Sequence, residues 1–471
     1  MSSLDWGLII GYVGLLIAMG LFHYRSNNSM EEYYVGNRKI GPTHVGLSVA
    51  ATDVGGGFSI GLGGLGFTIG LSGSWLLFTG LIGAILSAFI LIPVLKRSKK
   101  FENLLTYPQM LKVQYGAKAA LLAGVFSMVG YLGFTASQLL AGAKIASATF
   151  PEMSMDNLLI IMTTITIFYT VLGGIKAVIF TDSVQWIILF IGLAVFGIPY
   201  TINHLGGFQE IYNSLPKEYF SLTNVSGMQI LNWFLVIIPI WFIGMTLYQR
   251  IFCLENEAQA KKAWLIAGFF EWPIMAFLGT GLGLLARIAW MKGDLVSAPA
   301  AGLDAEMGLP LLLRDILPIG VKGIVLAAYF SAIMSTADSC LMATSGNVVS
   351  DIMGKWTDKL NTKKFLRLSQ IVTLGLGATA LLLALKVTSV LNLMLNSYAI
   401  MVAGLFIPTI HAIRGKTNSK AAISSMVAGG IVVIYFSATN LKPWGLELDP
   451  IAYGLVASFA AFAIVDKISK K

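Results

Sequence analysis

The fold is decided by residues 46–58, Gly46-Leu-Ser-Val-Ala-Ala-Thr-Asp53-Val-Gly55-Gly56-Gly57-Phe58, inside an apolar run long enough to cross a membrane. Each glycine in a helix costs about 1 kcal/mol relative to alanine, and here three of them follow one another beside an acidic side chain. Close helix packing explains glycine pairs four residues apart, but it does not explain this run. We therefore expect a membrane helix that is interrupted at Gly55–Gly57.

The composition around this stretch is that of a membrane protein. Apolar residues make up 56% of the 471 residues, and charged residues only 12%, against about 25% in soluble domains. One water-soluble core cannot hide so much apolar surface, so the surplus faces lipid. The net charge of +9 lies in short basic clusters between apolar runs, which favours membrane orientation over nucleic-acid binding.

Enzyme and cofactor signatures are absent from the sequence. Only two cysteines are present, Cys253 and Cys340, so no disulfide framework exists, and their isolation excludes a cysteine-based metal site. No phosphate-binding loop, nucleophile elbow or zinc motif is present. Gly61-x-Gly63-x-x-Gly66 matches the dinucleotide fingerprint by letter only, because no strand precedes it. We expect a protein that is not an enzyme.

Apolar runs repeat along the whole chain, 1–471, which we interpret as a single all-α polytopic membrane domain. A span needs about 20 mostly apolar residues, and in lipid such a span has to be a helix. About thirteen spans are expected. They lie near residues 4–24, 43–70, 72–95, 119–149, 157–174, 178–203, 228–248, 263–290, 319–346, 365–386, 390–413, 420–440 and 450–466.

The distribution of basic residues predicts the orientation of these spans. Asp5 precedes the first apolar run, and the first basic residue, Arg25, follows it, so we interpret this run as a true first helix with the N-terminus outside. The clusters at 96–100, 261–262 and 363–367 then fall on the inner side. The prediction is an outside N-terminus and an inside C-terminus.

A second interruption is expected in the seventh span. Pro239 lies within its apolar run, where proline removes a backbone hydrogen bond and kinks a helix. Spans two and seven are five apart, which suggests two inverted repeats, at about 43–203 and about 228–413, behind one leading helix. The spans within about 420–466 would be peripheral. Interrupted helices paired in this way expose backbone carbonyls to a cation near the midplane.

Acidic side chains within spans are costly and mark functional sites. Asp53, Asp182, Asp338 and Glu271 are the candidates, and a partner hydroxyl, Lys144 or Arg287 would be the ordinary structural explanation for them. In the ninth span four small or hydroxyl residues lie three or four apart and share one helix face. They are Ala332, Ser335, Thr336 and Ser339.

Three separated motifs resemble the sodium:solute symporter family. They are Tyr34-x-Gly36-x-Arg38, Leu172-Gly173-Gly174-x-x-Ala177 followed by Thr181-Asp182-x-Val184-Gln185, and Ala332-Ile-Met-Ser335-Thr336-Ala-Asp338-Ser339. That family includes sodium/proline, sodium/galactose and choline transporters. The resemblance implies the LeuT-type fold, with five-plus-five inverted repeats and one leading helix, and sodium as the coupling ion.

The resemblance also implies where sodium would bind. The main site would use backbone carbonyls of Ala51, Val54 and Ala332 with the hydroxyls of Ser335 and Thr336. Members with a second site place it near Asp182, Ser335, Asp338 and Ser339; hydroxyls are usual at the last two positions, and Asp338 departs from that pattern. The residues that we expect to contact substrate are Asp53, Ser137, Gln138, Trp241 and Asn396.

The expected function is sodium-coupled symport of a small organic solute by alternating access. A zwitterion or cation such as proline is favoured, and a monocarboxylate or proton coupling through Asp338 or Asp182 is the main alternative. A passive channel or a membrane sensor is a more distant one. The expected setting is a cell membrane, a bacterial inner membrane rather than a eukaryotic plasma membrane. Partners would be the solute and the lipid bilayer, with no nucleic acid and no obligatory protein partner.

Overall fold

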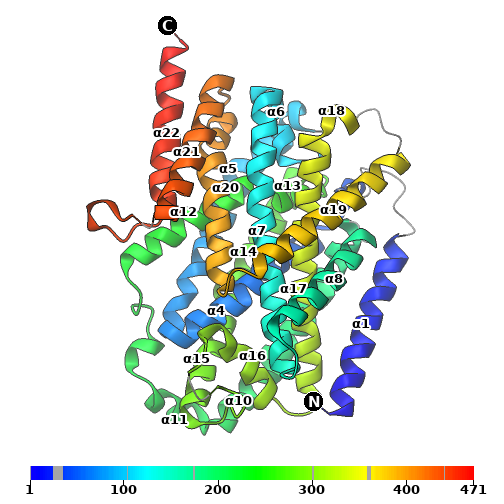
Figure 1. Ribbon diagram of the computed structural model, residues 1–471, viewed down its shortest axis with the longest axis vertical. Helices are drawn as coiled ribbons and strands as arrows, with labels where there is room; N and C mark the ends of the chain where they lie inside the picture. The colour runs from blue at the N-terminus through cyan, green and yellow to red at the C-terminus, as the bar shows by residue number, and fades with distance from the viewer. Residues whose placement is uncertain are drawn as a thin grey trace.

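The computed structural model describes residues 2–24, 35–102, 104–172, 175–299, 302–357, 362–439 and 441–470. Within these ranges the chain forms helices joined by loops, and no strand is found among them. Figure 1 shows the helices side by side along the long axis, with the start of α1 (Ser3–Tyr24) and the end of α22 (Pro450–Ile468) at opposite ends. This is the arrangement that an N-terminus and a C-terminus on opposite sides require.

Each predicted span coincides with a helix or with a pair of short helices. The remaining elements that build the bundle are α3 (Pro42–Val54), α4 (Gly56–Ile69), α5 (Trp75–Arg97), α7 (Ala117–Thr149), α8 (Met155–Leu172), α9 (Ile175–Ile191), α10 (Ile198–His204), α12 (Gly227–Ile243), α13 (Met245–Phe252), α14 (Glu257–Phe269), α15 (Ala276–Lys292), α17 (Val321–Gly346), α19 (Thr362–Ala384), α20 (Val390–Ile413) and α21 (Ser419–Thr439). Ten helices of the described residues are long and apolar enough to cross a membrane. The number of crossings and the side facing the cytoplasm stay predictions.

Short helices cover the ends of the bundle. They are α6 (Tyr107–Tyr115), α11 (Gly207–Ser214), α16 (Ala305–Asp315) and α18 (Gly354–Thr357). Among the described residues, the π-helical turns η4 (Gly192–Gly197) and η6 (Phe270–Met275) interrupt longer helices, and η7 (Asn347–Ile352) ends α17. Such turns are frequent at functional sites.

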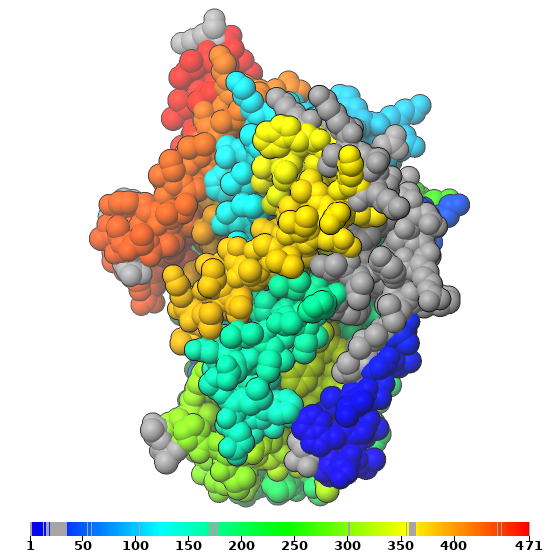
Figure 2. Space-filling model, turned by 45° about the vertical axis from the view of Figure 1, so that its right-hand side comes forward, coloured from blue at the N-terminus to red at the C-terminus, as the bar shows by residue number. Residues whose placement is uncertain are grey.

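Burial separates the central helices from the peripheral ones. In the segment Val321–Ile352, which holds α17, 78% of the most apolar window is buried, against 22% for α19 and for α22. The space-filling view in Figure 2 shows α21 and α22, in orange and red, projecting from one side, and α1, in blue, at the opposite edge. The division into two repeats with two peripheral helices stays a prediction.

The helix interruption predicted at Gly55–Gly57 is present. α3 ends at Val54 and α4 begins at Gly56, with Gly55 between them at φ 10° and ψ −169°. A side chain at Gly55 would contact Thr336 of α17 and Gln138 of α7, so the glycine also permits close approach. The interruption therefore lies against both α7 and α17.

The second interruption lies at Gly244, not at the proline. Pro239 is accommodated inside α12, and the backbone leaves helical geometry at Gly244, with φ −64° and ψ 116°. The prediction of a break at the proline was wrong in position. The reason is that Gly244 carries no side chain to clash with the Ile240 carbonyl and the Tyr131 hydroxyl, both of which a Cβ would approach within 3.1 Å.

Candidate functional site

One long helix, α7, caps both interrupted helices. The side-chain oxygen of Gln138 accepts hydrogen bonds from the backbone N–H groups of Gly56 (2.7 Å) and Gly57 (3.3 Å), at the start of α4. The hydroxyl of Tyr131 accepts one from the N–H of Thr246 (3.2 Å), at the start of α13. These N–H groups have no partner within their own helix. Tyr131 and Gln138 lie two turns apart, so one face of α7 stabilises both breaks.

Three of the predicted sodium ligands, Ala51, Ala332 and Thr336, lie together near the end of α3. The Thr336 hydroxyl lies 3.0 Å from the carbonyl oxygen of Ala332, to which it donates, and 3.4 Å from that of Ala51. Val54 is the last residue of α3, so its carbonyl belongs to the turn whose carbonyls lack helical partners; its side chain lies outside the described residues. A hydroxyl and several uncharged carbonyls are oxygen ligands that hard cations bind.

Ser335, the fifth predicted ligand, is held by an acidic neighbour. Its hydroxyl donates to Oδ1 of Asp182 on α9. Oδ2 of the same carboxylate accepts from the Ser48 hydroxyl of α3 at 2.5 Å. Both carboxylate oxygens therefore accept hydrogen bonds from protein groups within the bundle, where Asp182 is only 1% exposed. The contact of the Ser335 hydroxyl is therefore with Asp182, whereas its neighbour Thr336 contacts the Ala51 and Ala332 carbonyls.

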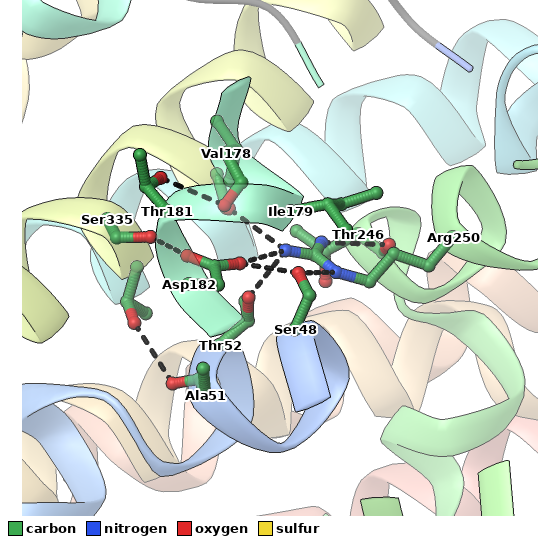
Figure 3. Close-up of polar contacts among 12 residues, drawn as sticks. Ser48, Ala51, Thr52, Val178, Ile179, Thr181, Asp182, Thr246, Arg250 and Ser335 are labelled. Atoms are coloured by element: carbon green, nitrogen blue, oxygen red, sulfur yellow. Dashed lines mark hydrogen bonds and ion pairs between the residues drawn. The ribbon is translucent and has the colours of Figure 1, made fainter. Parts of the chain in front are cut away.

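A buried arginine completes this polar cluster. Arg250 of α13 is 0% exposed, and its Nη2 lies 3.2 Å from Oδ2 of Asp182. The same nitrogen donates to the hydroxyls of Thr52 (2.6 Å) and Ser339 (3.2 Å), and Nε donates to Ser48 (3.0 Å). Figure 3 shows the guanidinium between α3, α9 and α13. We refer to Ser48, Thr52, Asp182, Arg250, Ser335 and Ser339 as the arginine cluster.

The role of Arg250 was not predicted from the sequence. It ends an apolar run, where basic residues ordinarily mark the membrane boundary. The available signal was Asp182, since a buried carboxylate needs a partner. The partners suggested for it, Lys144 and Arg287, lie elsewhere. Lys144 bonds Asp304 and Glu306, each at 2.6 Å, and Arg287 stacks over the Phe67 and Trp290 rings.

The residues predicted for a second sodium site do not form one group. Asp182 and Ser339 both contact the Arg250 guanidinium. Asp338 is fully buried outside that cluster, near Thr170 of α8. The positive charge between Asp182 and Ser339 is therefore supplied by the protein itself. Tyr34, Gly173 and Gly174 of the sequence motifs lie outside the described residues.

The residues predicted to contact substrate are spread over different environments. Asp53 is 8% exposed in the last turn of α3, and its carboxyl interacts with that of Glu271 on η6. Trp241 is fully buried beside Gly83 of α5. The Ser137 hydroxyl donates to the Phe134 carbonyl at 2.8 Å. Asn396 is exposed, although its neighbour Ser397 is buried. Gln138 serves as the cap described above.

Comparisons with known proteins agree with this architecture. A family model described as the sodium:solute symporter family matches residues 33–429. A sodium/proline symporter of Staphylococcus aureus is 27% identical over 488 residues, covering 98% of this chain and 92% of that protein. The structure of a substrate-bound, outward-open Na+-coupled sialic acid symporter matches with a TM-score of 0.79 at 21% identity, covering 99% and 98% of the two chains.

A more distant structure shares the fold. The nucleobase-cation symporter Mhp1, in a closed conformation with bromovinylhydantoin, matches with a TM-score of 0.57 at 13% identity, over 93% of this chain and 95% of that one. The LeuT-type fold expected from the sequence is thus confirmed. Because the family model spans most of the chain, the protein belongs to the sodium:solute symporter family, as a multi-pass membrane transporter with sodium as its coupling ion.

Proposed function

We propose that this protein imports a small zwitterion, with proline as the leading candidate, together with sodium bound at the end of α3. One observation carries the sodium site: the Thr336 hydroxyl meets the carbonyls of Ala51 and Ala332 beside the break at Gly55. Val54 and Ser335 complete the ligand set. The sodium/proline relative supports the choice of solute, since the similarity extends over 98% of this chain.

Asp53 is proposed to bind the ammonium group of the solute. It follows Ala51 in the last turn of α3 and retains 8% exposure, whereas Asp182 is satisfied by the arginine cluster. A carboxylate at the C-terminal end of a helix is disfavoured by the helix dipole, so a cationic group brought by sodium or solute would be stabilising there. This reasoning favours zwitterions and cations over monocarboxylates.

One sodium per cycle is the proposed stoichiometry. The guanidinium of Arg250 donates to both Asp182 and Ser339, and it carries a fixed positive charge that no sodium ion would displace easily. A single sodium is energetically sufficient. One charge crossing about 100 mV contributes about 2.3 kcal/mol, and a tenfold gradient about 1.4 kcal/mol. Together these support roughly 500-fold accumulation of the solute.

The alternating-access cycle would act on the two interrupted helices. Helices α3 and α13 are joined through Arg250, while α4 and α13 are both capped from α7. Sodium bound between α3 and α17 would stabilise one arrangement of these helices more than the other. A ligand shifts a conformational equilibrium only by such a difference in affinity. Solute binding would be coupled to sodium binding because the last turn of α3 positions both Asp53 and the proposed sodium ligands.

The test is uptake by purified protein in proteoliposomes. Proline, choline and lactate are compared under sodium and potassium gradients, and external pH is varied at fixed sodium. The proposal expects sodium-dependent proline uptake with one sodium per proline and little dependence on a proton gradient. Uptake that follows the proton gradient without sodium would support proton coupling instead, and uptake of lactate alone would replace the zwitterion by a monocarboxylate.

A further inference from the structure

A water-accessible cavity lies away from the proposed sodium site. It has a volume of about 640 Å³ and three walls: the loop that precedes α3, the end of α5, and the joint between α13 and α14. Cavities of this size hold small ligands or lipid headgroups. The positive-inside reading of the sequence places this end at the cytoplasmic surface, because the basic cluster at 96–100 forms one wall.

Positive charge dominates the lining of this cavity. Its cationic side chains are Arg38, Lys39, Lys96, Arg97 and Lys99, and its acidic ones are Glu102 and Glu255. Arg97 is neutralised by Glu257, with contacts of 2.6 and 2.8 Å. Lys39 and Lys99 are exposed and take part in none of the ion pairs found among the described residues. The described lining therefore keeps an excess of positive charge that an anion would balance.

Contacts between the three walls hold the cavity open. The ammonium group of Lys96 donates to the Leu254 carbonyl at 2.5 Å, which joins α5 to the end of α13. The N–H of Ile40 donates to the Cys253 carbonyl at 3.1 Å, which joins the loop before α3 to the same segment. Asn37 and Arg38, on that loop, both have φ 57°. Non-glycine residues keep this left-handed conformation only where the surroundings enforce it.

Exposed apolar side chains lie on α5, the helix whose end forms one wall of the cavity. Phe89 of α5, two turns before Arg97, is 58% exposed, and Ile90 beside it is 45% exposed. The Lys261 ammonium lies 5.4 Å from the centre of the Phe89 ring. An apolar surface on a helix that ends at a cationic cavity matches an amphiphile, with its acyl chains along α5 and its charged headgroup inside.

We propose that this cavity binds the phosphate group of an anionic phospholipid from the inner leaflet. Lysine and arginine side chains are the usual partners of phosphate oxygens, and basic pockets between membrane helices on the cytoplasmic side bind such headgroups. The bound lipid would bridge the loop before α3, which leads into the sodium site, to the end of α13, which carries Arg250. This binding goes beyond the transport function and is measured without it.

The experiment compares two double variants in detergent. Lys39→Gln with Lys99→Gln removes the two unpaired lining charges. Lys420→Gln with Lys467→Gln is the matched control, because these exposed lysines of α21 and α22 lie outside the cavity. Binding of phosphatidylglycerol and of phosphatidylcholine is followed by native mass spectrometry and by the thermal unfolding midpoint. Inorganic phosphate at constant ionic strength forms a third arm, and unfolding without lipid reports whether each variant folds.

The proposal expects phosphatidylglycerol to bind tighter than phosphatidylcholine, and the cavity variant to lose about thirtyfold in that affinity. The control variant should keep it. Stabilisation by inorganic phosphate that the cavity variant loses would support the same phosphate site with a soluble anion as the source. Equal binding of both lipids, or equal loss in the cavity and control variants, would overturn the proposal.

Discussion

The two interrupted helices are built differently, although the same helix caps both. The break between α3 and α4 lies in a run of three glycines, next to Asp53, and the Gln138 amide caps it. The break between α12 and α13 depends on Gly244 alone, and the Tyr131 phenol caps it. We propose that the first break presents oxygen ligands to sodium. The second break begins α13, which carries the buried guanidinium of Arg250, so here the protein itself supplies the positive charge.

This contrast assigns different roles to the two breaks. In the proposed function, the end of α3 offers uncharged oxygens to an exchangeable sodium ion, whereas α13 carries a charge that stays with the protein. Both meet at α17, through Thr336 and through Ser339 respectively. A transporter needs the ion at the first break to leave, and the fixed charge at the second to remain. Variants at each break separate these roles.

The largest effect is expected at the fixed charge. Arg250→Met leaves Asp182 as an unpaired buried carboxylate, and breaking a buried ion pair costs about 3–5 kcal/mol. The variant should unfold at a markedly lower temperature and should not transport. Thermal unfolding in detergent and proteoliposome uptake are the measurements. The double variant Arg250→Met with Asp182→Leu should recover much of the lost stability; a single variant as stable as wild type would contradict the assignment.

The next effect tests the space at the first break. Gly55→Ala places a Cβ about as close as 2.7 Å to Thr336 and 2.8 Å to Gln138. Overpacking of this kind costs typically about 1–3 kcal/mol, and it displaces Thr336 from the carbonyls, so the sodium requirement should rise. Gly281→Ala is the control, because a Cβ there meets nothing within 4 Å. If both variants required the same sodium concentration in a titration, the break at Gly55 would not be part of the sodium site.

A smaller effect distinguishes the two caps. Gln138→Leu and Tyr131→Phe each remove a cap whose loss costs typically about 1 kcal/mol. Gln138 caps the half-helix next to the ion site, so its variant should also weaken sodium binding, whereas Tyr131→Phe should lower stability with less change in sodium affinity. Sodium-dependent thermal shifts measure both quantities. If both variants shifted the sodium titration equally, the proposed difference between the two breaks would be lost.

The smallest effect is expected for an exposed ion pair of the same chemistry. Arg97 and Glu257 join α5 to α14 with contacts of 2.6 and 2.8 Å, but the Arg97 side chain is 72% exposed. Exposed pairs contribute little, and salt screens them. Glu257→Gln should therefore shift the unfolding midpoint slightly at low salt and not at about 1 M salt. A large shift of the unfolding midpoint that salt leaves unchanged would show that the difference in exposure between Arg97 and Arg250 does not set their contributions to stability.

Features that follow from local sequence could be predicted. Apolar runs gave the spans, and the glycine run gave the position of the first break, because both depend on a single segment. The second break was assigned to Pro239, since proline is the stronger local signal. Gly244 became the break because Tyr131, far away in sequence, approaches it and caps the next helix.

For the same reason, the candidate site could be predicted from the sequence only in part. The resemblance of the ninth span to the sodium:solute symporter family indicated Ser335 and Thr336 as sodium ligands. The structure places the Thr336 hydroxyl beside the carbonyls of Ala51 and Ala332, which were also predicted. The pairing of Arg250 with Asp182 joins two helices that are distant in sequence, and nothing local to either residue specifies it. The role of Gln138 as a cap for α4 depends on a contact between helices distant in sequence, and its expected contact with substrate stays a prediction.

Sodium-dependent binding by variants of α17 tests the central claim most directly. Thermal stabilisation of purified protein is titrated with sodium at constant ionic strength, for wild type, Thr336→Ala and Ser335→Ala, with Thr344→Ala as a control elsewhere on the same helix. The Thr344 hydroxyl donates to the Cys340 carbonyl of the same helix at 2.7 Å. The account predicts that Thr336→Ala and Ser335→Ala require at least tenfold more sodium, a loss of about 1.4 kcal/mol, while the control does not. An unchanged sodium titration for Thr336→Ala would contradict a sodium site at the end of α3.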